Sequence, residues 1–197
     1  PRQALKKILN AAHQLGYKVF TGMEFEWFNF LETPKSFADK GHMSPQSLTP
    51  GMFGYSLIRI GQNVDYFNAL MDELLKFKVP LEGLHTETGP GIFEAAITYS
   101  EALEDADRAV LFKSSAKDIG ARFGIMPSFM AKWSQHLPGC SGHTHLSLWS
   151  NGKNLFYDEQ DKYKMSETYK HFVAGVLHCL PEFLPFYAST VNSYKSL

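Results

Sequence analysis

Carboxylates are crowded in two short segments of this 197-residue chain, and that crowding restricts the folds open to it. Glu24 and Glu26 lie two residues apart in an aromatic run, so a strand would direct both to one face. Glu87 and Glu94 flank a Gly-Pro-Gly turn at residues 89–91, and the resulting hairpin would set like charges opposite each other, which is unfavourable. We therefore expect a fold that gathers these groups around shared cations.

Each pair taken alone has an ordinary explanation. An E-x-E pair on a strand is most often a solvated edge, and acidic residues at a hairpin tip are most often wet. Aromatic neighbours such as Trp27 and Phe28 indicate instead a buried strand, where an uncompensated carboxylate costs several kcal/mol. In the hairpin, Gly89 and Gly91 allow close backbone approach around the rigid Pro90. Bound cations would relieve the repulsion in both places.

A third candidate group is the sequence His143-Thr144-His145. On a strand the two imidazoles and Ser147 share one face, which fits either a structural role or a ligand or phosphate contact. Four carboxylates and a histidine make an oxygen-rich donor set that favours Mg²⁺ or Mn²⁺ over a structural zinc. Such ions usually serve phosphate chemistry, yet the chain has no G-x-x-x-x-G-K-[ST] loop and no kinase signature. A nucleotide would therefore be bound by metals and strands.

Composition limits the class of protein. The chain is 44% apolar and 14% aromatic, which suffices for one sizeable core in a single domain or in part of a larger one. Basic residues number 19 against 20 acidic ones, so no net field favours nucleic acid or an anionic membrane surface. We expect a small, locally bound partner, no nucleic acid and no membrane association.

The chain contains two cysteines, Cys140 and Cys179, and neither belongs to a C-x-x-C pair. A reducing compartment is therefore expected rather than a disulfide framework. No stretch of about 18 uncharged apolar residues is present, and the first residues have the spacing of an amphipathic helix rather than of a signal sequence. We predict a cytoplasmic chain.

Periodicity and turn residues predict the order of helices and strands. A helix over residues 2–15 is ended by Gly16, a strand covers 17–30, and a long ordered loop follows over 31–55. Ser100 is a suitable N-cap for the longest helix, which runs to Gly124. The other expected elements are a helix over 64–77 that Pro80 stops, hairpin strands at 81–87 and 93–99, strands at 125–132 and 143–149, and a helix over 166–180. This order implies an α+β fold with a mainly antiparallel sheet.

Several segments, in order, resemble the glutamine synthetase superfamily, particularly its type I branch and the related γ-glutamyl amine ligases. Residues 22–26 (G-M-E-F-E) are similar to the family strand G-P-E-x-E, and residues 87–94 to its hairpin E-x-x-P-G-Q-x-E. Residues 142–148 (G-H-T-H-L-S-L) are similar to H-x-H-x-S-L, and residues 152–158 and 192–195 continue the match. The resemblance covers essentially the whole chain. It implies a curved, mainly antiparallel sheet with helices packed on its outer face.

The resemblance also implies a reaction and its metal ligands. Glu26, Glu87 and Glu94 would hold one Mg²⁺ or Mn²⁺ ion, while Glu24 and His143 would hold a second ion that bridges the transferred phosphoryl group. The implied reaction joins ammonia or a small amine to the γ-carboxylate of glutamate, with ATP as substrate and γ-glutamyl phosphate as intermediate. Within this chain no catalytic residue is implied beyond the metal ligands.

Other positions match nucleotide and substrate contacts of the family. The nucleotide-contacting positions are matched by Glu82, Tyr99, His145 and Ser147, and a glutamate-binding glycine by Gly139. In a regular hairpin, Glu82 and Tyr99 fall on the face opposite Glu87 and Glu94. A bulge or sharp curvature is therefore needed to bring them to the site.

Three positions depart from the family pattern. Pro138 stands where many members have asparagine, and Ile92 replaces the usual glutamine of the hairpin, so amino-acid recognition is expected to differ. Ser196 occupies the place of the arginine in N-S-Y-K-R-L that pairs with the substrate carboxylate. Loss of that charge-assisted contact points to a different substrate, to lost activity or to an unreliable chain end.

The resemblance places the chain within a longer protein. Relative to the family it begins after a small N-terminal β domain and stops before later arginines and a last metal-binding glutamate. Residues 1–197 are therefore expected to be one partial catalytic domain. Active sites of this family form between neighbouring subunits of a homo-oligomeric ring, so this piece alone is expected to be inactive.

Two alternatives to an enzyme remain at this point. One is a catalytically inactive structural member of the lengsin type, which Ser196 favours. The other is a phosphate-binding regulatory module, for which the sequence has no positive signature. The five matched metal ligands favour the enzyme, because retaining buried ionic ligands without an ion is costly.

Overall fold

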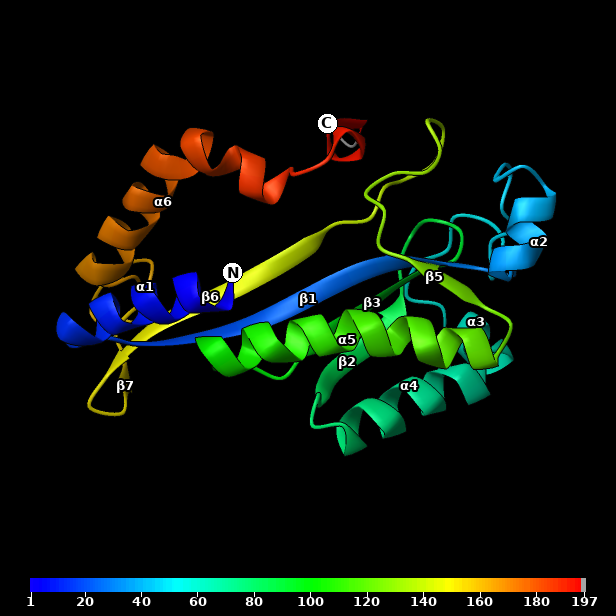
Figure 1. Cartoon of the computed structure of the whole chain (residues 1–197). Helices are drawn as coiled ribbons and strands as arrows, with labels where there is room; N and C mark the ends of the chain where they lie inside the picture. Colours follow the sequence, from blue (N-terminus) through cyan, green and yellow to red (C-terminus); the bar gives the residue numbers. More distant parts are fainter. Residues whose placement is uncertain (196–197) are drawn as a thin grey trace.

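The computed structural model describes residues 1–195, and a curved antiparallel sheet forms its centre (Figure 1). Within these residues the strands are β1 Lys18–Phe30, β2 Leu81–Thr86, β3 Ile92–Ile97, β4 Ser100–Glu101, β5 Met126–Ser128, β6 Gly142–Ser150 and β7 Lys153–Asn154. The order across the sheet is β2-β3-β1-β6-β7, and the short strands β4 and β5 also pair with β1. The long strand β1 therefore holds the sheet together.

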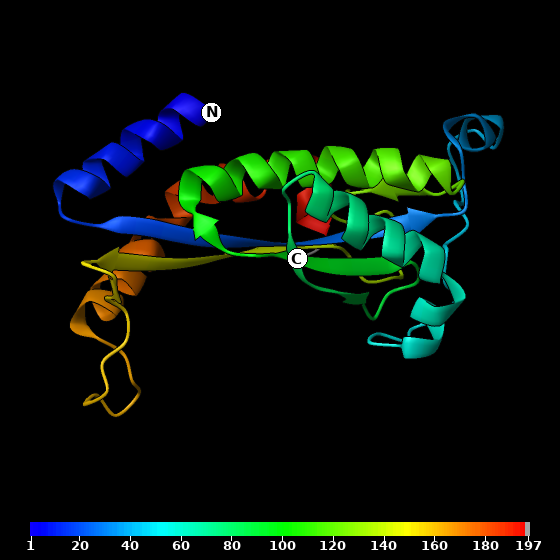
Figure 2. The ribbon, with the colours of Figure 1, turned by 90° about the horizontal axis from the view of Figure 1, so that it is seen from below.

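Helices cover one face of this sheet. The helices of the described chain are α1 Arg2–Gln14, α2 Pro34–Asp39, α3 Leu57–Gln62, α4 Val64–Lys76, α5 Ala102–Arg122, α6 Glu167–Tyr187 and the 3₁₀ helix η1 Val191–Lys195. α5 lies along β1, and α4 packs beside α5 on the same side (Figures 1 and 2). Among the helices of residues 1–195, none combines the length and apolar character needed to cross a bilayer. The expected α+β fold with helices on one outer face is confirmed.

The core between the sheet and the helices is aromatic. Trp27 of β1, Phe93 of β3 and Phe112 of α5 are fully buried. Phe112 stacks on Phe25 with ring centroids 5.5 Å apart and meets Trp27 edge-on at 5.5 Å. Such pairs add about 0.5–1.5 kcal/mol beyond the burial of their area. Because strand side chains alternate, this packing turns the odd-numbered residues of β1 to α5 and leaves the even-numbered ones on the other face.

A buried asparagine fixes the end of β1 to the hairpin turn. Asn29 Oδ1 accepts hydrogen bonds from Trp27 Nε1 and from the Tyr66 hydroxyl, both at 2.9 Å. Asn29 Nδ2 donates to the Gly91 carbonyl at 3.1 Å, and the Gly91 N–H donates to Thr49 Oγ1 at 3.0 Å. Gly91 has φ +71°, a conformation that suits glycine. The turn that follows Glu87 is thus held from both sides.

The α6 segment, residues 166–195, lies beyond β6, on the side away from α4 and α5 (Figure 1). At its start, Phe156 packs on Tyr169 and Phe172 with ring centroids 5.0 and 5.2 Å apart. At its far end, the Asn192 side chain bonds to the backbone of Lys132 in the loop between β5 and β6. The segment is therefore anchored at both ends.

Several expected elements are confirmed. The helix over 2–15, the strand over 17–30, the helix over 64–77 and both hairpin strands correspond to α1, β1, α4, β2 and β3 within a few residues. Gly16 takes φ +84° after α1, as expected of a glycine that ends a helix. Ser166 caps α6, because its side chain accepts from the Tyr169 N–H. Cys140 and Cys179 are both free thiols.

The expectation that Ser100 caps the longest helix is wrong. Ser100 pairs with Thr21 in the short strand β4, and α5 begins at Ala102 after Glu101, whose side chain makes no capping bond. Ser100 therefore belongs to a strand that pairs with β1, although its hydroxyl would suit the start of a helix. α5 ends at Arg122, slightly before the expected Gly124.

Other boundaries also differ from expectation. The loop over 31–55 contains α2, which Thr33 and Ser36 cap reciprocally, and α3 follows it; neither helix was expected. The strand over 125–132 is shortened to β5. α6 continues past residue 180 to Tyr187 through Pro181 and Pro185, because an exposed helix can accommodate the kinks and lost hydrogen bonds of internal prolines.

Phe112→Ala is expected to lower the free energy of unfolding by about 3–5 kcal/mol, because it removes a fully buried ring and leaves a cavity. Urea titration of the purified protein followed by circular dichroism measures this. Val110→Ala on the same helix is the matched control, since Val110 is 67% exposed and should change stability by less than about 0.5 kcal/mol. Similar losses in both variants would contradict the described core.

Glu32 gives stability a pH dependence. Its carboxylate accepts hydrogen bonds from Lys40 Nζ and Ser36 Oγ, and these lower its pKa from 4.5 to about 2. A lowered pKa in the folded state stabilises the fold above pH 4.5, and this stabilisation is lost as the pH falls toward 2. Glu32→Gln should therefore be less stable than the parent at pH 7, with a difference that shrinks at low pH.

Urea titrations at a series of pH values measure the effect of Glu32→Gln. Asp39→Asn is the control, because the Asp39–Lys35 ion pair is exposed and contributes little. A stability difference for Glu32→Gln that is the same at pH 2.5 and pH 7 would refute the role of the carboxylate charge.

Candidate functional site

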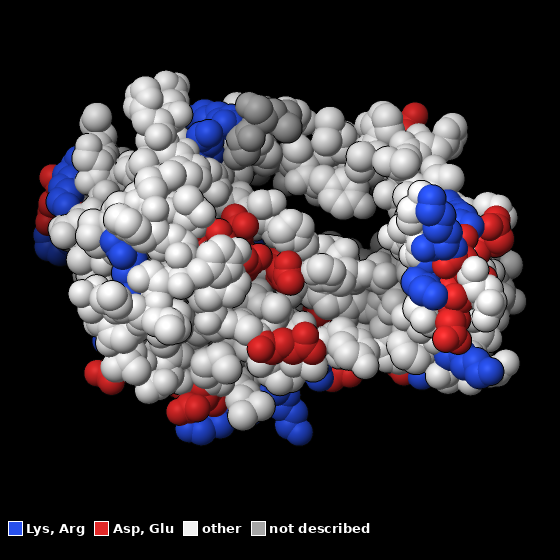
Figure 3. Space-filling view, turned by 180° about the vertical axis from the view of Figure 1, so that it is seen from behind, with Lys and Arg blue, Asp and Glu red and all other residues white. Residues whose placement is uncertain are grey.

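An acidic strip lies on the sheet face opposite α5; it consists of Glu24 and Glu26 of β1, Glu94 of β3 and Glu87 after β2. The strand register places Glu24 opposite His143 of β6 and Glu26 opposite Glu94 of β3. The next strand, β2, places His85 opposite Glu94. In the view of this face, acidic side chains gather near the middle, beside a hollow between the body and the α6 segment (Figure 3).

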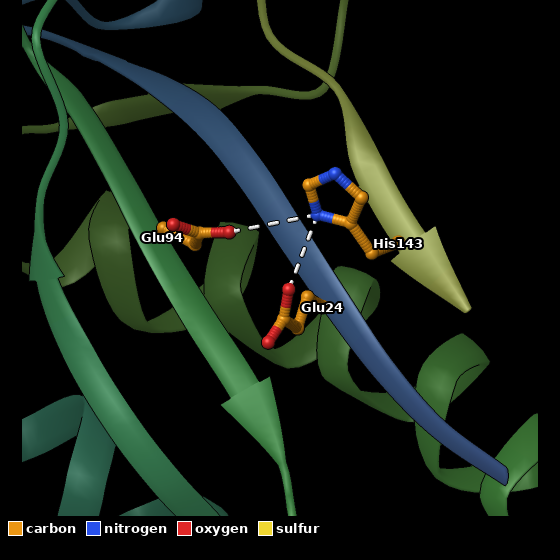
Figure 4. Close-up of side chains that lie close together, drawn as sticks. All are labelled: Glu24, Glu94 and His143. Carbon is orange, nitrogen blue, oxygen red and sulfur yellow. Dashed lines mark hydrogen bonds and ion pairs between the residues drawn. The ribbon is translucent and has the colours of Figure 1, made fainter. Parts of the chain in front are cut away.

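The Glu24 cluster consists of Glu24, Glu94 and His143 (Figure 4). His143 Nδ1 lies 3.1 Å from Glu24 Oε2 and 4.0 Å from Glu94 Oε1. His145 approaches the same carboxylate, with its Nε2 3.2 Å from Glu24 Oε1. The two strands come this close because Gly142 has no side chain: a Cβ there would lie 2.9 Å from the Glu24 carbonyl oxygen.

The His85 cluster consists of His85, Glu87 and Glu94. His85 Nδ1 lies 3.6 Å from Glu87 Oε1, and His85 Nε2 lies 3.4 Å from Glu94 Oε2. The Tyr55 ring stacks on the imidazole with centroids 4.8 Å apart, and the Tyr55 N–H donates to the Thr86 carbonyl at 2.6 Å. Sequence reasoning missed His85, although its H-x-E spacing to Glu87 puts both on one face of a strand.

Negative charge on this face is not balanced by the described side chains. Burial raises the pKa of Glu94; His85 opposes this, and the neighbouring carboxylates of the strip raise it further. Hydrogen bonding to Glu87 and its charge raise the pKa of Tyr55 to about 12. Glu87 Oε1 is buried and has no hydrogen-bond partner among the described residues. A buried carboxylate oxygen without a hydrogen bond, whose nearest charged partner is the His85 imidazole 3.6 Å away, is costly, so the arrangement suits a cation.

Glu26 lies between the two clusters in register, but it belongs to neither. Its Oε2 accepts from the Ser141 N–H at 2.8 Å, and its own N–H donates to the Ser141 carbonyl at 3.2 Å. The structure thus joins Glu24 to His143 and Glu87 to Glu94, with Glu94 within reach of both groups. The expected division of the five ligands between two ions remains a prediction.

A cavity of about 340 Å³ continues the strip along β1. Its lining includes all four positions matched to nucleotide contacts, Glu82, Tyr99, His145 and Ser147. The expected bulge is present: the register of β2 shifts between Leu81 and Gly83. This shift turns Glu82 to the same face as Glu24. Tyr99 follows the end of β3 and lies edge-on to Phe20, with ring centroids 6.2 Å apart.

The positions matched to substrate contacts lie at the other end of the strip. Gly139 is half-buried in the loop between β5 and β6, two residues before Ser141. In the same loop, the Pro138 Cβ lies 3.4 Å from the position that a Cβ on Gly89 would take, so the loop contacts the hairpin turn. Ser196 lies outside the described residues.

Comparison with known proteins assigns the chain to a family. The family model for the catalytic domain of glutamine synthetase matches residues 1–197. The chain belongs to the glutamine synthetase family. A type-1 glutamine synthetase 2 of Dictyostelium discoideum is 55% identical over 199 residues, covering 100% of this chain and 38% of that protein. A glutamate–isopropylamine ligase of a Pseudomonas species is 32% identical over 196 residues, covering 99% of this chain and 43% of that protein.

Solved structures of the family confirm the expected fold. A GmaS/ADP complex has a TM-score of 0.87 at 30% identity, covering 100% of this chain and 44% of that one. A glutamine synthetase of Plasmodium falciparum has a TM-score of 0.85 at 22% identity, which supports the fold alone. The chain spans less than half the length of each of these relatives. Relatives named as synthetases and glutamate–amine ligases make this a family of ligases.

Gly142→Ala is expected to separate β6 from β1, because its Cβ would lie 2.9 Å from the Glu24 carbonyl oxygen. His143 would then move away from Glu24, and the affinity of the full-length protein for Mn²⁺ should fall about tenfold, the effect typical of disturbed ligand positions. Isothermal titration calorimetry measures the affinity. Gly175→Ala is the control, since a Cβ there meets nothing within 4 Å. Unchanged Mn²⁺ affinity in Gly142→Ala would contradict the expectation.

Proposed function

We propose that the full-length protein is an ATP-dependent, ADP-forming ligase that joins ammonia or a small amine to the γ-carboxylate of glutamate through γ-glutamyl phosphate. The observation that carries the proposal is the convergence of carboxylates and an imidazole on one face, beside a cavity. The residues come from strands β1, β3 and β6 and from the turn after β2: Glu24, Glu26, Glu87, Glu94 and His143. Relatives named as glutamine synthetases and as a glutamate–isopropylamine ligase support it.

The donor set fits two Mg²⁺ or Mn²⁺ ions. Its oxygen atoms and single imidazole suit hard divalent cations. Glu87 Oε1, which has no hydrogen bond, and the raised pKa of Glu94 indicate charge that a cation would balance. We assign Glu26, Glu87 and Glu94 to one ion, and Glu24 and His143 to the other. When bound, these ions would neutralise charge on the phosphoryl oxygens during transfer.

The remaining contacts place the substrates. Residues lining the cavity would bind ATP: Tyr99 offers a ring face to the adenine, Glu82 a carboxylate to the ribose, and His145 and Ser147 hydrogen-bond donors to phosphates. Gly139 would bind glutamate through its backbone, where the half-buried loop approaches Glu26 and the hairpin turn. Phosphoryl transfer needs little covalent chemistry from the protein, so positioning by these groups is the main task of the chain.

The second candidate is a catalytically inactive structural member of the family, of the lengsin type. The serine at position 196, in place of the family arginine that pairs with the substrate carboxylate, favours it. The crowded carboxylates favour the enzyme, because their mutual repulsion lowers stability and a structural role does not require them to lie together. Turnover by the full-length protein distinguishes the two candidates.

We also propose the molecular context. Residues 1–197 form one part of the catalytic domain of a cytoplasmic protein that assembles into a homo-oligomeric ring, and the isolated piece lacks activity. The support is that the chain matches only 38–43% of the length of its curated relatives. Completing the site would then require groups from the rest of the protein.

Coupled assay of ADP release by the full-length protein tests the proposed function, with glutamate, ATP and Mg²⁺ and with ammonia, ethanolamine, isopropylamine and polyamines as acceptors. Glu94→Gln should lower kcat/KM by at least about a hundredfold, because Glu94 belongs to both clusters and a lost metal ligand removes charge stabilisation in transfer. Glu104→Gln is the control, since Glu104 lies on α5 in an exposed ion pair with Arg108.

A protein that binds Mn²⁺ and ATP but releases no ADP with any of these acceptors would favour the inactive structural member. Equal activity of Glu94→Gln and Glu104→Gln would instead remove the acidic strip from the mechanism.

A further inference from the structure

The loop between β5 and β6, residues 129–141, connects the substrate side of the strip to Glu26. Its last residue, Ser141, donates its N–H to Glu26 Oε2 at 2.8 Å and accepts the Glu26 N–H at 3.2 Å. Gly139 lies two residues earlier. Because the loop has no regular helix or strand, its shape depends on a small number of specific contacts.

One of these contacts comes from η1, which lies beside the loop in Figure 1. Asn192 Oδ1 accepts the Lys132 N–H at 2.7 Å, and Asn192 Nδ2 donates to the Lys132 carbonyl at 2.7 Å. A primary amide is suited to this pairing, since it offers one acceptor and one donor side by side. The pair joins two residues that are 60 positions apart in the chain.

A backbone hydrogen bond connects the anchored part of the loop to the part that contains Gly139. Ala131, next to Lys132, accepts the Cys140 N–H at 2.7 Å, so the two arms of the loop are tied together. Cys140 is buried in a cluster with Phe28 and Phe30. Gly139 therefore sits directly between the tie at Cys140 and the contact of Pro138 with the hairpin turn.

We propose that Asn192 is a positioning residue that holds the 129–141 loop in the shape that binds glutamate, and so sets the affinity of the protein for that substrate. The proposal rests on the proposed function for the identity of the substrate. Asn192 acts through the backbone of Lys132 and through Gly139, and it does not line the cavity that we propose for ATP. Substitution of Asn192 should therefore weaken the binding of glutamate and leave the binding of ATP unchanged.

Steady-state kinetics of full-length Asn192→Ala provides the first test. The KM for glutamate should rise about tenfold, as expected from two lost hydrogen bonds, while the KM for ATP stays within about twofold. Asn192→Gln, which keeps the same donor and acceptor on a longer side chain, should restore part of the affinity. Ser193→Ala is the matched control, because Ser193 Oγ is hydrogen-bonded to Thr190 in the same segment.

Amide hydrogen exchange provides a second readout that does not require activity. In Asn192→Ala the amides of Lys132 and Cys140 should exchange faster, while those of α5 keep their protection. Unchanged exchange in the loop overturns the anchor, and faster exchange with an unchanged glutamate KM overturns its role in binding. Equal increases in the KM for glutamate and the KM for ATP would also overturn the role of Asn192 in glutamate binding. A parent protein without turnover would refute the proposed function, and the exchange data would still decide whether Asn192 holds the loop.

Discussion

The antiparallel pairing of β1 with β3 on one side and with β6 on the other determines which side chains meet on the acidic face. This pairing sets Glu24 opposite His143 and Glu26 opposite Glu94. A slip of one residue would turn these side chains toward α5 and the aromatic core, where Phe25 and Trp27 now pack. Burial of the aromatic face thus fixes the register, and the register then holds the like charges together against their repulsion.

Strand alternation made the heart of the site predictable from sequence. Period-two spacing alone placed Glu24 with Glu26 and His143 with His145. For Glu82, which only the family resemblance had marked as a site residue, the parity of the hairpin required a bulge, and the structure contains one. The same spacing rule covers His85, which was missed because a single histidine near a turn usually has a structural role. Its position opposite Glu94 depends on a cross-strand register that one strand cannot reveal by itself.

The remaining differences come from contacts between distant parts of the chain. Ser100 has the chemistry of a helix cap, but Thr21 of β1 recruits it into the sheet. The turn at Gly91 is shaped by Asn29 and by Thr49, and the loop before β6 by Asn192, each of which lies far away in sequence. Local propensity cannot anticipate such partners, because their contribution exists only once the tertiary fold has formed.

The shared position of Glu94 has a thermodynamic consequence. One of its oxygens faces His143 and the other faces His85, so a single carboxylate serves two neighbouring groups of donor atoms. Under the proposed assignment Glu94 would hold one ion, while its other oxygen lies 4.0 Å from His143, a proposed ligand of the second. The two proposed sites would then not be independent: filling one would change the affinity of the other, and linkage would make that change equal in both directions. Metal titrations of this protein would then be cooperative, with a sign set by whether the first ion orients Glu94 for the second or competes for it.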